Sequence, residues 1–300
     1  MPKISSNYGH DKILKDYLGL PKWFLVPTTI QHGWYADIHL GDLVSRNGEK
    51  FYLTWSKRVA LAATGQTKQR IVVLSAPFIL FRKEKKIEIS EKAKGTVVFP
   101  QHSSKSISID YDIDKYCKQL KNLPKDYHPI TICLHWIDFP KQAAEYENHG
   151  FTVVCAGESR QPRYGFVEKF YAILSKHKYS SSNEIGSYAF YAVEMGIPFF
   201  IFGERPNFLI KNNQKKLTES SELINQRAKA VRLFSKQTKS ISSEQANYVA
   251  EELGLTDAVS RKELRQQYIK YGIIYQIFLA PIKPLRAIIR SCKKRCSKQN

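Results

Sequence analysis

The stretch PITICLHWIDFPKQAAEYENHGFTVVCAG, residues 129–157, contains a complete strand–helix–strand unit. Residues 129–136 and 151–157 are short, almost entirely apolar runs, as expected of strands whose two faces are both covered. Between them, residues 139–150 follow a helical pattern. Pro140 lies in its first turn and Gly150 just past its end, which are the positions that favour these two residues. The stretch therefore predicts a βαβ unit of a parallel sheet.

The same alternation continues on both sides of this unit. We expect further strands at residues 24–30, 50–55, 70–78, 96–100 and 197–203, and further helices at 56–65, 113–123, 163–177 and 181–196. The charged segment 82–95 is the candidate boundary between two units. From about residue 211 on there is no strand pattern, and Ser242 and Ser260 each begin a capping-box sequence, which marks a helix start.

The predicted fold class is therefore α/β, with two Rossmann-like βαβ units that contain parallel sheets. We expect the first unit in residues 1–90, the second in residues 91–210, and a helical C-terminal extension in residues 211–300.

Composition limits the classes of protein to consider. With 43% hydrophobic and 12% aromatic residues, the 300-residue chain can bury a core. Its five cysteines are too scattered for a disulfide framework, and neither a signal peptide nor an apolar run of 18 residues is present, so we expect a cytoplasmic protein. The net charge of +20 predicts an anionic partner, such as a lipid surface, a nucleic acid or a phosphorylated substrate.

Polar residues follow the predicted strands at the edge of the sheet where ligands bind. In open α/β sheets this edge lies beyond the carboxyl ends of the strands. His32, His102 and His135 all fall there, and Gln31, Gln101, Ser103, Ser104, Trp136 and Glu158 lie beside them. A histidine binds an anion when protonated and acts as a base when neutral. Three of them at one edge predict a ligand site.

Three consecutive serines, Ser180, Ser181 and Ser182, stand at the expected start of the helix at 181–196. Serine hydroxyls cap the unpaired N–H groups of a first helical turn. The same N–H groups also bind phosphate. The serines are thus either a plain helix cap or one wall of a phosphate pocket, and both interpretations stay open at this point.

The ordered set of motifs resembles the GT-B glycosyltransferases, and within them the transferases that build capsule and teichoic-acid polymers. The matching elements, spread over residues 24–205, are Ile30-Gln31-His32-Gly33-Trp34, Leu134-His135-Trp136, Tyr179-Ser180-Ser181-Ser182 and Gly196-Ile197-Pro198. The resemblance implies a metal-independent transfer of a sugar from a CMP-, CDP- or UDP-linked donor to a glycan or lipid-linked acceptor. The product would be a bacterial surface polysaccharide, such as capsule or lipopolysaccharide.

The resemblance also implies roles for individual residues. His32 would be the general base that accepts the proton of the attacking hydroxyl. His102, His135, Ser180, Ser181 and Ser182 would bind the donor phosphate. Glu184 would contact the ribose, although a carboxylate near a helix N-terminus is equally expected to serve the helix alone. No cofactor is expected.

Several alternatives stay open. Asp110, Asp112 and Asp114 imitate a metal-binding motif, but carboxylates in this position more often belong to a helix start. Other candidate functions are a polyol-phosphate transferase, which would use the same histidines, a sugar-nucleotide epimerase, and a nucleic-acid-binding protein. The last of these lacks a recognisable nucleic-acid-binding motif, so we expect no nucleic acid partner.

The C-terminal segment 271–300 combines an apolar, aromatic beginning with seven basic residues and no acidic residue. Such a segment is suited to lie in the interface of an anionic membrane. We therefore expect the protein on the inner face of the plasma membrane, attached peripherally through this segment.

Overall fold

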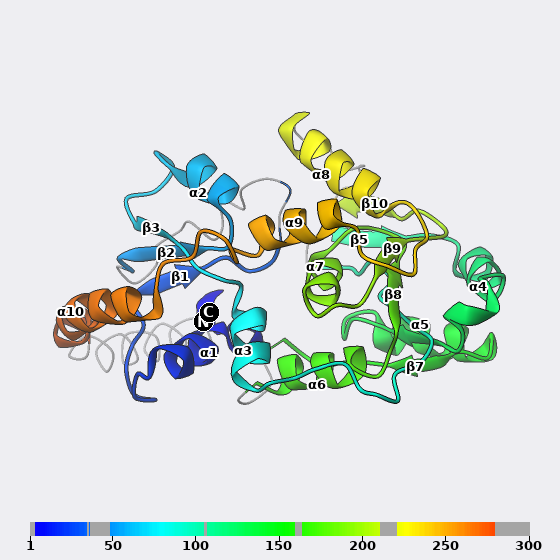
Figure 1. The fold of residues 1–300 in the computed structure, drawn as a ribbon, viewed down its shortest axis with the longest axis horizontal. Coiled ribbons are helices and arrows are strands. Elements are labelled where there is room, and N and C mark those ends of the chain that lie inside the picture. The colour runs from blue at the N-terminus through cyan, green and yellow to red at the C-terminus, as the bar shows by residue number, and fades with distance from the viewer. Residues whose placement is uncertain are drawn as a thin grey trace, which may run out of the picture.

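The computed structural model describes residues 4–34, 36, 49–104, 107–159, 164–210 and 221–279. It contains two parallel sheets that lie side by side (Figure 1). The smaller sheet has the order β1 (Thr28–Ile30), β2 (Phe51–Thr54), β3 (Arg70–Val73). The larger sheet has the order β7 (Thr152–Val154), β6 (Ile130–Cys133), β4 (Thr96–Val98), β8 (Tyr179–Ser182), β9 (Phe199–Ile201). All strand pairs in both sheets are parallel. The predicted α/β class with parallel sheets is confirmed.

Helices connect successive strands along the chain, and the alternating pattern predicted all of these helices except the one at Pro77–Glu84, which links the two sheets. They are α2 (Lys57–Ala63), α3 (Pro77–Glu84), α4 (Ile113–Lys121), α5 (Phe139–Asn148), α6 (Gly165–Leu174) and α7 (Ser187–Glu194). A short 3₁₀ helix, Lys125–Tyr127, follows α4, and another, Ile4–Gly9, leads into α1 (His10–Leu18). The Asp112 side chain caps α4 by accepting a hydrogen bond from the Lys115 N–H at 2.8 Å. The carboxylate thus belongs to a helix start.

The two sheets share one hydrophobic core. It contains Phe51 of β2, Phe170 of α6, Tyr191 of α7 and Tyr268 of the last helix, all of them buried. The ring of Phe78 in α3 stacks on Tyr191, with centroids 4.5 Å apart and the planes 6° from parallel. The proposed boundaries after residues 90 and 210 stay a prediction, because the core is continuous across both.

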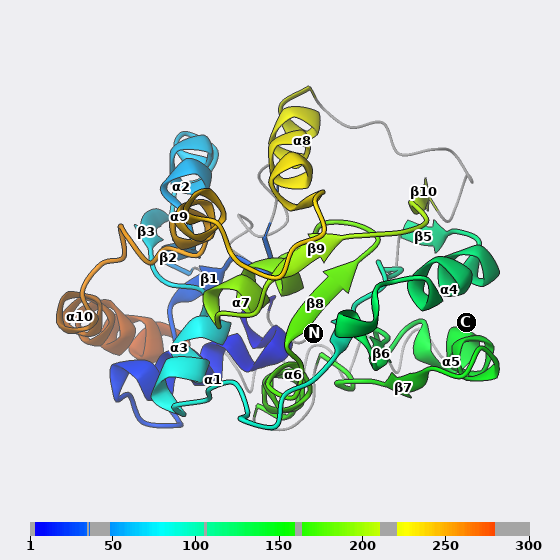
Figure 2. The same cartoon turned by 45° about the vertical axis from the view of Figure 1, so that its right-hand side comes forward.

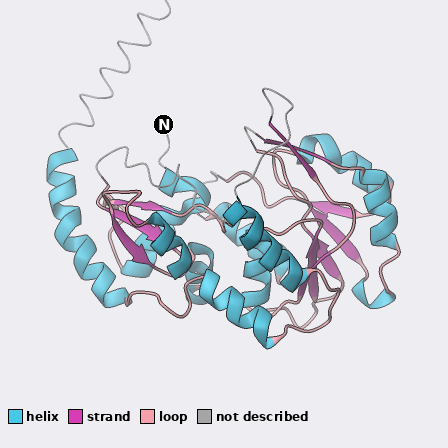
Figure 3. Cartoon of the chain, turned by 90° about the horizontal axis from the view of Figure 1, so that it is seen from above, coloured by secondary structure: helices cyan, strands magenta, loops and turns pink. Residues whose placement is uncertain are grey.

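The C-terminal helices pack against earlier helices and strands of the chain. They are α8 (Ser221–Phe234), α9 (Ser243–Glu252) and α10 (Arg261–Leu279). Figure 3 shows them from above. The predicted capping box of α9 is present, since Ser242 accepts from the Gln245 N–H and Gln245 from the Ser242 N–H. Gly254 follows with a φ of 66°, and a Cβ there would lie 2.2 Å from the Trp55 carbonyl oxygen, so the crossing after α9 requires glycine.

The structure differs from the sequence prediction at four places. The strand expected at 70–78 ends at Val73, because Pro77 begins α3. The helix expected at 181–196 begins only at Ser187, so the three serines lie in β8. The ladder of β5 (Ile107–Asp110) with β10 (Asn207–Ile210) was not expected, nor was α1.

Among the described residues, none of the helices combines the length and the apolar character that a membrane crossing requires. Most of the basic segment at 271–300 lies outside the described residues, which end at Leu279.

Candidate functional site

A cavity of about 550 Å³ opens between the two parallel sheets. It lies beyond the carboxyl ends of β1, β4 and β6, where ligands of open α/β sheets bind. The N-terminus of α7 forms another part of the wall, and Figure 2 shows α7 between the smaller sheet and strands β8 and β9. The volume is in the range of small-molecule sites. Much of the lining is aromatic and includes Phe78, Phe99, Phe166, Phe170, Tyr188 and Tyr191.

The structure brings His32, His102 and His135 together in the lining of this cavity. The rings of His102 and His135 stack, with centroids 3.9 Å apart and planes 17° from parallel. His32 comes from the smaller sheet, and its ring stacks on Tyr8 at 5.2 Å. Three imidazoles from two different sheets thus border one space.

These imidazoles lie in an apolar environment, which disfavours the charged form. Burial, with smaller contributions from the neighbouring His102 and His32, lowers the pKa of His135 to about 3. Burial also lowers the pKa of His102, although the Ser103 carbonyl and the Asp138 carboxylate oppose the shift. Both rings are therefore neutral at pH 7 in the free protein, and they act there as hydrogen-bonding groups rather than as cations.

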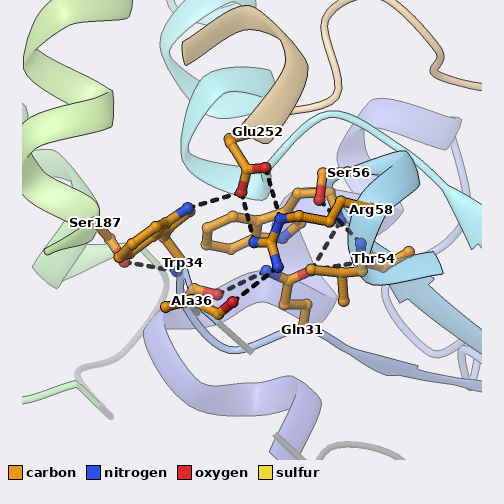
Figure 4. Close-up of polar contacts among 11 residues, drawn as sticks. Gln31, Trp34, Ala36, Thr54, Ser56, Arg58, Ser187 and Glu252 are labelled. Carbon is orange, nitrogen blue, oxygen red and sulfur yellow. Dashed lines mark hydrogen bonds and ion pairs between the residues drawn. The ribbon is translucent and has the colours of Figure 1, made fainter. Parts of the chain in front are cut away.

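Buried polar contacts hold the loop that carries His32 from the side of β2 (Figure 4). The side chain of Gln31 is 1% exposed and donates to the Gly33 carbonyl at 2.8 Å. Its Oε1 accepts hydrogen bonds from the Thr54 hydroxyl at 2.6 Å and from the Trp55 N–H at 2.9 Å. The loop therefore begins from a fixed point at the end of the smaller sheet.

Trp34 holds the same loop from the opposite side (Figure 4). Its main-chain N–H donates to the Ser187 hydroxyl at the start of α7, and its indole N–H donates to Glu252 of α9, both at 2.8 Å. Glu252 also receives two hydrogen bonds from Arg58 of α2, at 2.8 and 2.9 Å, and Arg58 donates to the Ala36 carbonyl. The position of His32 thus depends on α2, α7 and α9 as well as on its own strand.

The three serines are fully buried in β8. The hydroxyls of Ser180 and Ser181 donate to the carbonyls of Pro198 and Phe200, at 3.2 and 2.9 Å. The Ser182 hydroxyl lies 2.9 Å from the Tyr188 hydroxyl, which lines the cavity, and accepts from the Glu184 N–H. A phosphate role for these serines stays a prediction. Ser182 contacts the cavity lining through Tyr188.

Glu184 lies in the turn between β8 and α7. One carboxylate oxygen accepts from the Ile185 N–H at 2.8 Å, and the other lies 3.7 Å from Arg205. The lining itself contains Ile185, Gly186 and Ser187, so the helix N-terminus borders the cavity although the serines do not begin it. Whether Glu184 contacts a ribose stays a prediction.

The three aspartates of the possible metal motif each have a different structural role. Asp110 ends β5, Asp112 caps α4, and Asp114 pairs with His149 at 2.6 Å. In the described parts of the chain, no cluster of three His, Cys, Asp or Glu side chains is suited to hold a metal ion.

Sequence reasoning missed three residues near the cavity. Tyr8 and Arg227 line it, and His10 lies behind it, with its ring centroid 6.5 Å from that of His32. Tyr8 and His10 belong to an N-terminal region without a strand pattern, and Arg227 to a helix whose approach to the cavity is set by tertiary packing. No local pattern marks any of them.

Comparisons with known proteins give only distant similarities. No protein-family model matches the chain, and no curated protein matches it. Among solved structures, the wall teichoic acid polymerase TagF is similar at 14% identity and a TM-score of 0.33, over 90% of this chain and 68% of that one. A TagF variant soaked with CDPG is similar at 13% identity and a TM-score of 0.32, over 77% of this chain. This chain spans about half of that structure, 52%.

Proposed function

We propose that this protein is a metal-independent glycosyltransferase of bacterial surface polysaccharide synthesis. It transfers a sugar from a CMP-, CDP- or UDP-linked donor to a hydroxyl of a glycan or lipid-linked acceptor. The observation that supports this proposal is the meeting of His32, His102 and His135, from two parallel sheets, around one cavity that the N-terminus of α7 also borders.

The chemistry of transfer has two demands that these groups can meet. The attacking hydroxyl loses a proton, and His32, held by the contacts of its loop, is the base in this proposal. A positioned base typically contributes about 10²–10⁴ in rate. The leaving phosphate gains negative charge, and a helix N-terminus and neutral N–H donors stabilise such a charge without a metal ion.

Arg227 supplies a positive charge in this lining. It belongs to α8, and its guanidinium also lies over the Phe208 ring, 5.2 Å from the centroid. A guanidinium forms bidentate hydrogen bonds with phosphate. In the proposed function Arg227 joins His135 and the α7 N-terminus in binding the donor phosphates. The transfer of a polyol phosphate from a similar donor would use the same groups.

A nucleotide panel measured by thermal unfolding tests this proposal. A ligand that binds only the folded state, present at 100 times its Kd, adds about 2.7 kcal/mol of stability. We expect one of CMP, CDP, UMP or UDP to raise Tm by several degrees, in proportion to the logarithm of its concentration. Failure of all four to stabilise the protein would contradict the proposed function.

Variants then separate the roles of the histidines. His32→Ala should lose turnover and keep nucleotide binding, whereas His135→Ala should weaken both. His149→Ala provides a control, because His149 pairs with Asp114 outside the cavity lining. Near wild-type turnover in His32→Ala would show that another group is the base.

A further inference from the structure

Hydrogen bonds distinguish the two stacked histidines of the cavity from each other. Nδ1 of His102 lies 2.9 Å from the carbonyl oxygen of Ser103. A carbonyl oxygen only accepts hydrogen bonds, so Nδ1 carries the proton. Because a neutral imidazole has a single N–H, Nε2 of His102 presents a lone pair.

His135 has the opposite arrangement. Its Nδ1 accepts a hydrogen bond from the Ile137 N–H at 3.4 Å. A nitrogen that accepts has no proton, so the proton of neutral His135 is on Nε2. The stacked pair therefore offers one acceptor, on His102, and one donor, on His135.

The environment of Ser103 keeps His102 in this form. The Ser103 N–H donates to the buried Asp138 carboxylate at 2.7 Å, and the Ser103 hydroxyl accepts from the Ile109 N–H at 3.1 Å. One residue before His102, the Gln101 N–H donates to the Asn183 side chain at 2.8 Å. These three contacts hold the loop on both sides of His102, so the Ser103 carbonyl stays directed at Nδ1.

A phosphate group and a hydroxyl group differ in what they require from such a pair. The charged oxygens of a nucleotide phosphate only accept hydrogen bonds, and they would face a lone pair on His102. A sugar or polyol hydroxyl carries a proton that it can donate. We propose that His102 binds a hydroxyl group of the substrate through Nε2, and that the phosphate contact of the stacked pair is made by His135 alone.

This inference rests on the proposed function, since a sugar donor and its acceptor supply the hydroxyl groups. It changes the role of His102 from a phosphate ligand to a residue that selects and orients a hydroxyl. The hydroxyl can belong to the transferred group of the donor or to the acceptor; in the acceptor it is a hydroxyl other than the attacking one, whose proton goes to His32.

Nitrogen NMR of the full chain with ¹⁵N-labelled histidine tests the inference without an activity assay. At pH 7 we expect Nε2 of His102 to have the shift of an unprotonated nitrogen and Nδ1 that of a protonated one. The chain contains two references away from the cavity: His177 donates through Nδ1 to Ile173, and His128 through Nε2 to Leu123. A proton on Nε2 of His102 at pH 7 would overturn the inference.

Binding of inorganic pyrophosphate supplies a second test. His135→Leu should weaken it about tenfold, the effect of losing one hydrogen bond to a charged group, and His102→Leu should change it less than threefold. Equal losses in the two variants would also overturn the inference. If pyrophosphate and all nucleotides fail to bind the wild-type protein, the proposed function is wrong, and the NMR result still decides the state of His102.

A third comparison identifies the source of the hydroxyl. The affinities for the stabilising nucleotide and for its hexose conjugate, together with kcat, are measured in the wild type, in His102→Leu and in His102→Gln. The amide oxygen of the Gln variant can still accept a hydrogen bond. Loss of affinity for the conjugate alone, with recovery in the Gln variant, assigns the hydroxyl to the donor. Unchanged affinities with a loss of kcat that Gln partly restores assign it to the acceptor. Wild-type affinity and kcat in the Leu variant would refute the role.

Discussion

His10 is a buried imidazole whose polar atoms have no hydrogen-bond partner among the described residues. It is 1% exposed and lies near the rings of Tyr8, His32 and Phe78, with centroids 5.9, 6.5 and 5.9 Å away. Burial, with a smaller contribution from His32, lowers its pKa to about 3. We predict that this residue makes the protein sensitive to acid.

The direction of the pH effect on stability follows from proton binding to the folded and unfolded states. In the unfolded chain a histidine has a pKa of about 6.5, so between pH 6.5 and pH 3 the unfolded state binds more protons than the folded state. Stability therefore rises with pH in this window and is lost as the pH falls through it. The slope approaches about 1.4 kcal/mol per pH unit for one group, which gives about 2 kcal/mol between pH 7 and pH 5.

His10→Leu removes this contribution. Leucine has a similar volume and no polar atom to bury, so we expect the stability at pH 7 to stay the same or to rise by about 1 kcal/mol. Urea unfolding at pH 7 and pH 5 measures the effect: the variant should lose about 2 kcal/mol less than the wild type between these two values. His149→Leu, outside the cavity, controls for the removal of a histidine. An equal loss in wild type and His10→Leu would refute the burial of a neutral imidazole at this site.

Three further predictions concern the site and its surroundings. Glu252→Gln weakens the ion pair with the partly exposed Arg58, so we expect the stability of the protein to fall by about 2 kcal/mol. Because Glu252 also holds the loop of His32, we expect kcat to fall more than the nucleotide affinity, measured as Kd. The double variant Ser181→Ala with Ser182→Ala should abolish nucleotide-induced stabilisation if these serines bind phosphate; unchanged affinity would leave them a structural role alone. EDTA should leave turnover intact, and rescue by Mg²⁺ or Mn²⁺ after a loss would contradict the metal-independent mechanism.

The structure indicates where the chain should be truncated to test the predicted membrane binding. Tyr268 of α10 is fully buried, and its ring centroid lies 5.0 Å from that of Phe51, so truncation before α10 would disturb the core. A chain ending at Leu279 keeps this packing. We expect it to sediment less with anionic liposomes than the full chain does, with a difference that decreases as salt increases. Equal sedimentation of the two would exclude residues 280–300 as the membrane-binding segment.

Local features of this protein could be predicted from sequence because neighbouring residues determine them. Pro140 in the first turn of α5, the capping box of Ser242 and the apolar strands on both sides of 139–150 all act within a few residues along the chain. The position of His32, His102 and His135 at strand ends followed from the same pattern. Parallel strands place their carboxyl ends on one edge, so the histidines of a single sheet were expected to meet.

Only the tertiary structure determined the hydrogen-bond partners and the protonated nitrogens of the site residues. Ser180 and Ser181 lie in a strand because β8 pairs with β4 and β9, and their hydroxyls donate hydrogen bonds to the carbonyls of Pro198 and Phe200. No local sequence pattern reports those partners. Glu252, which lies 218 residues after Trp34 in the sequence, holds the loop of His32 by accepting a hydrogen bond from the Trp34 indole. The proton on Nδ1 of His102 depends on a carbonyl that Asp138, 35 residues from Ser103, keeps in place. Sequence determined which residues reach the cavity edge, whereas the chemical form of each depends on groups that only folding brings within hydrogen-bond distance.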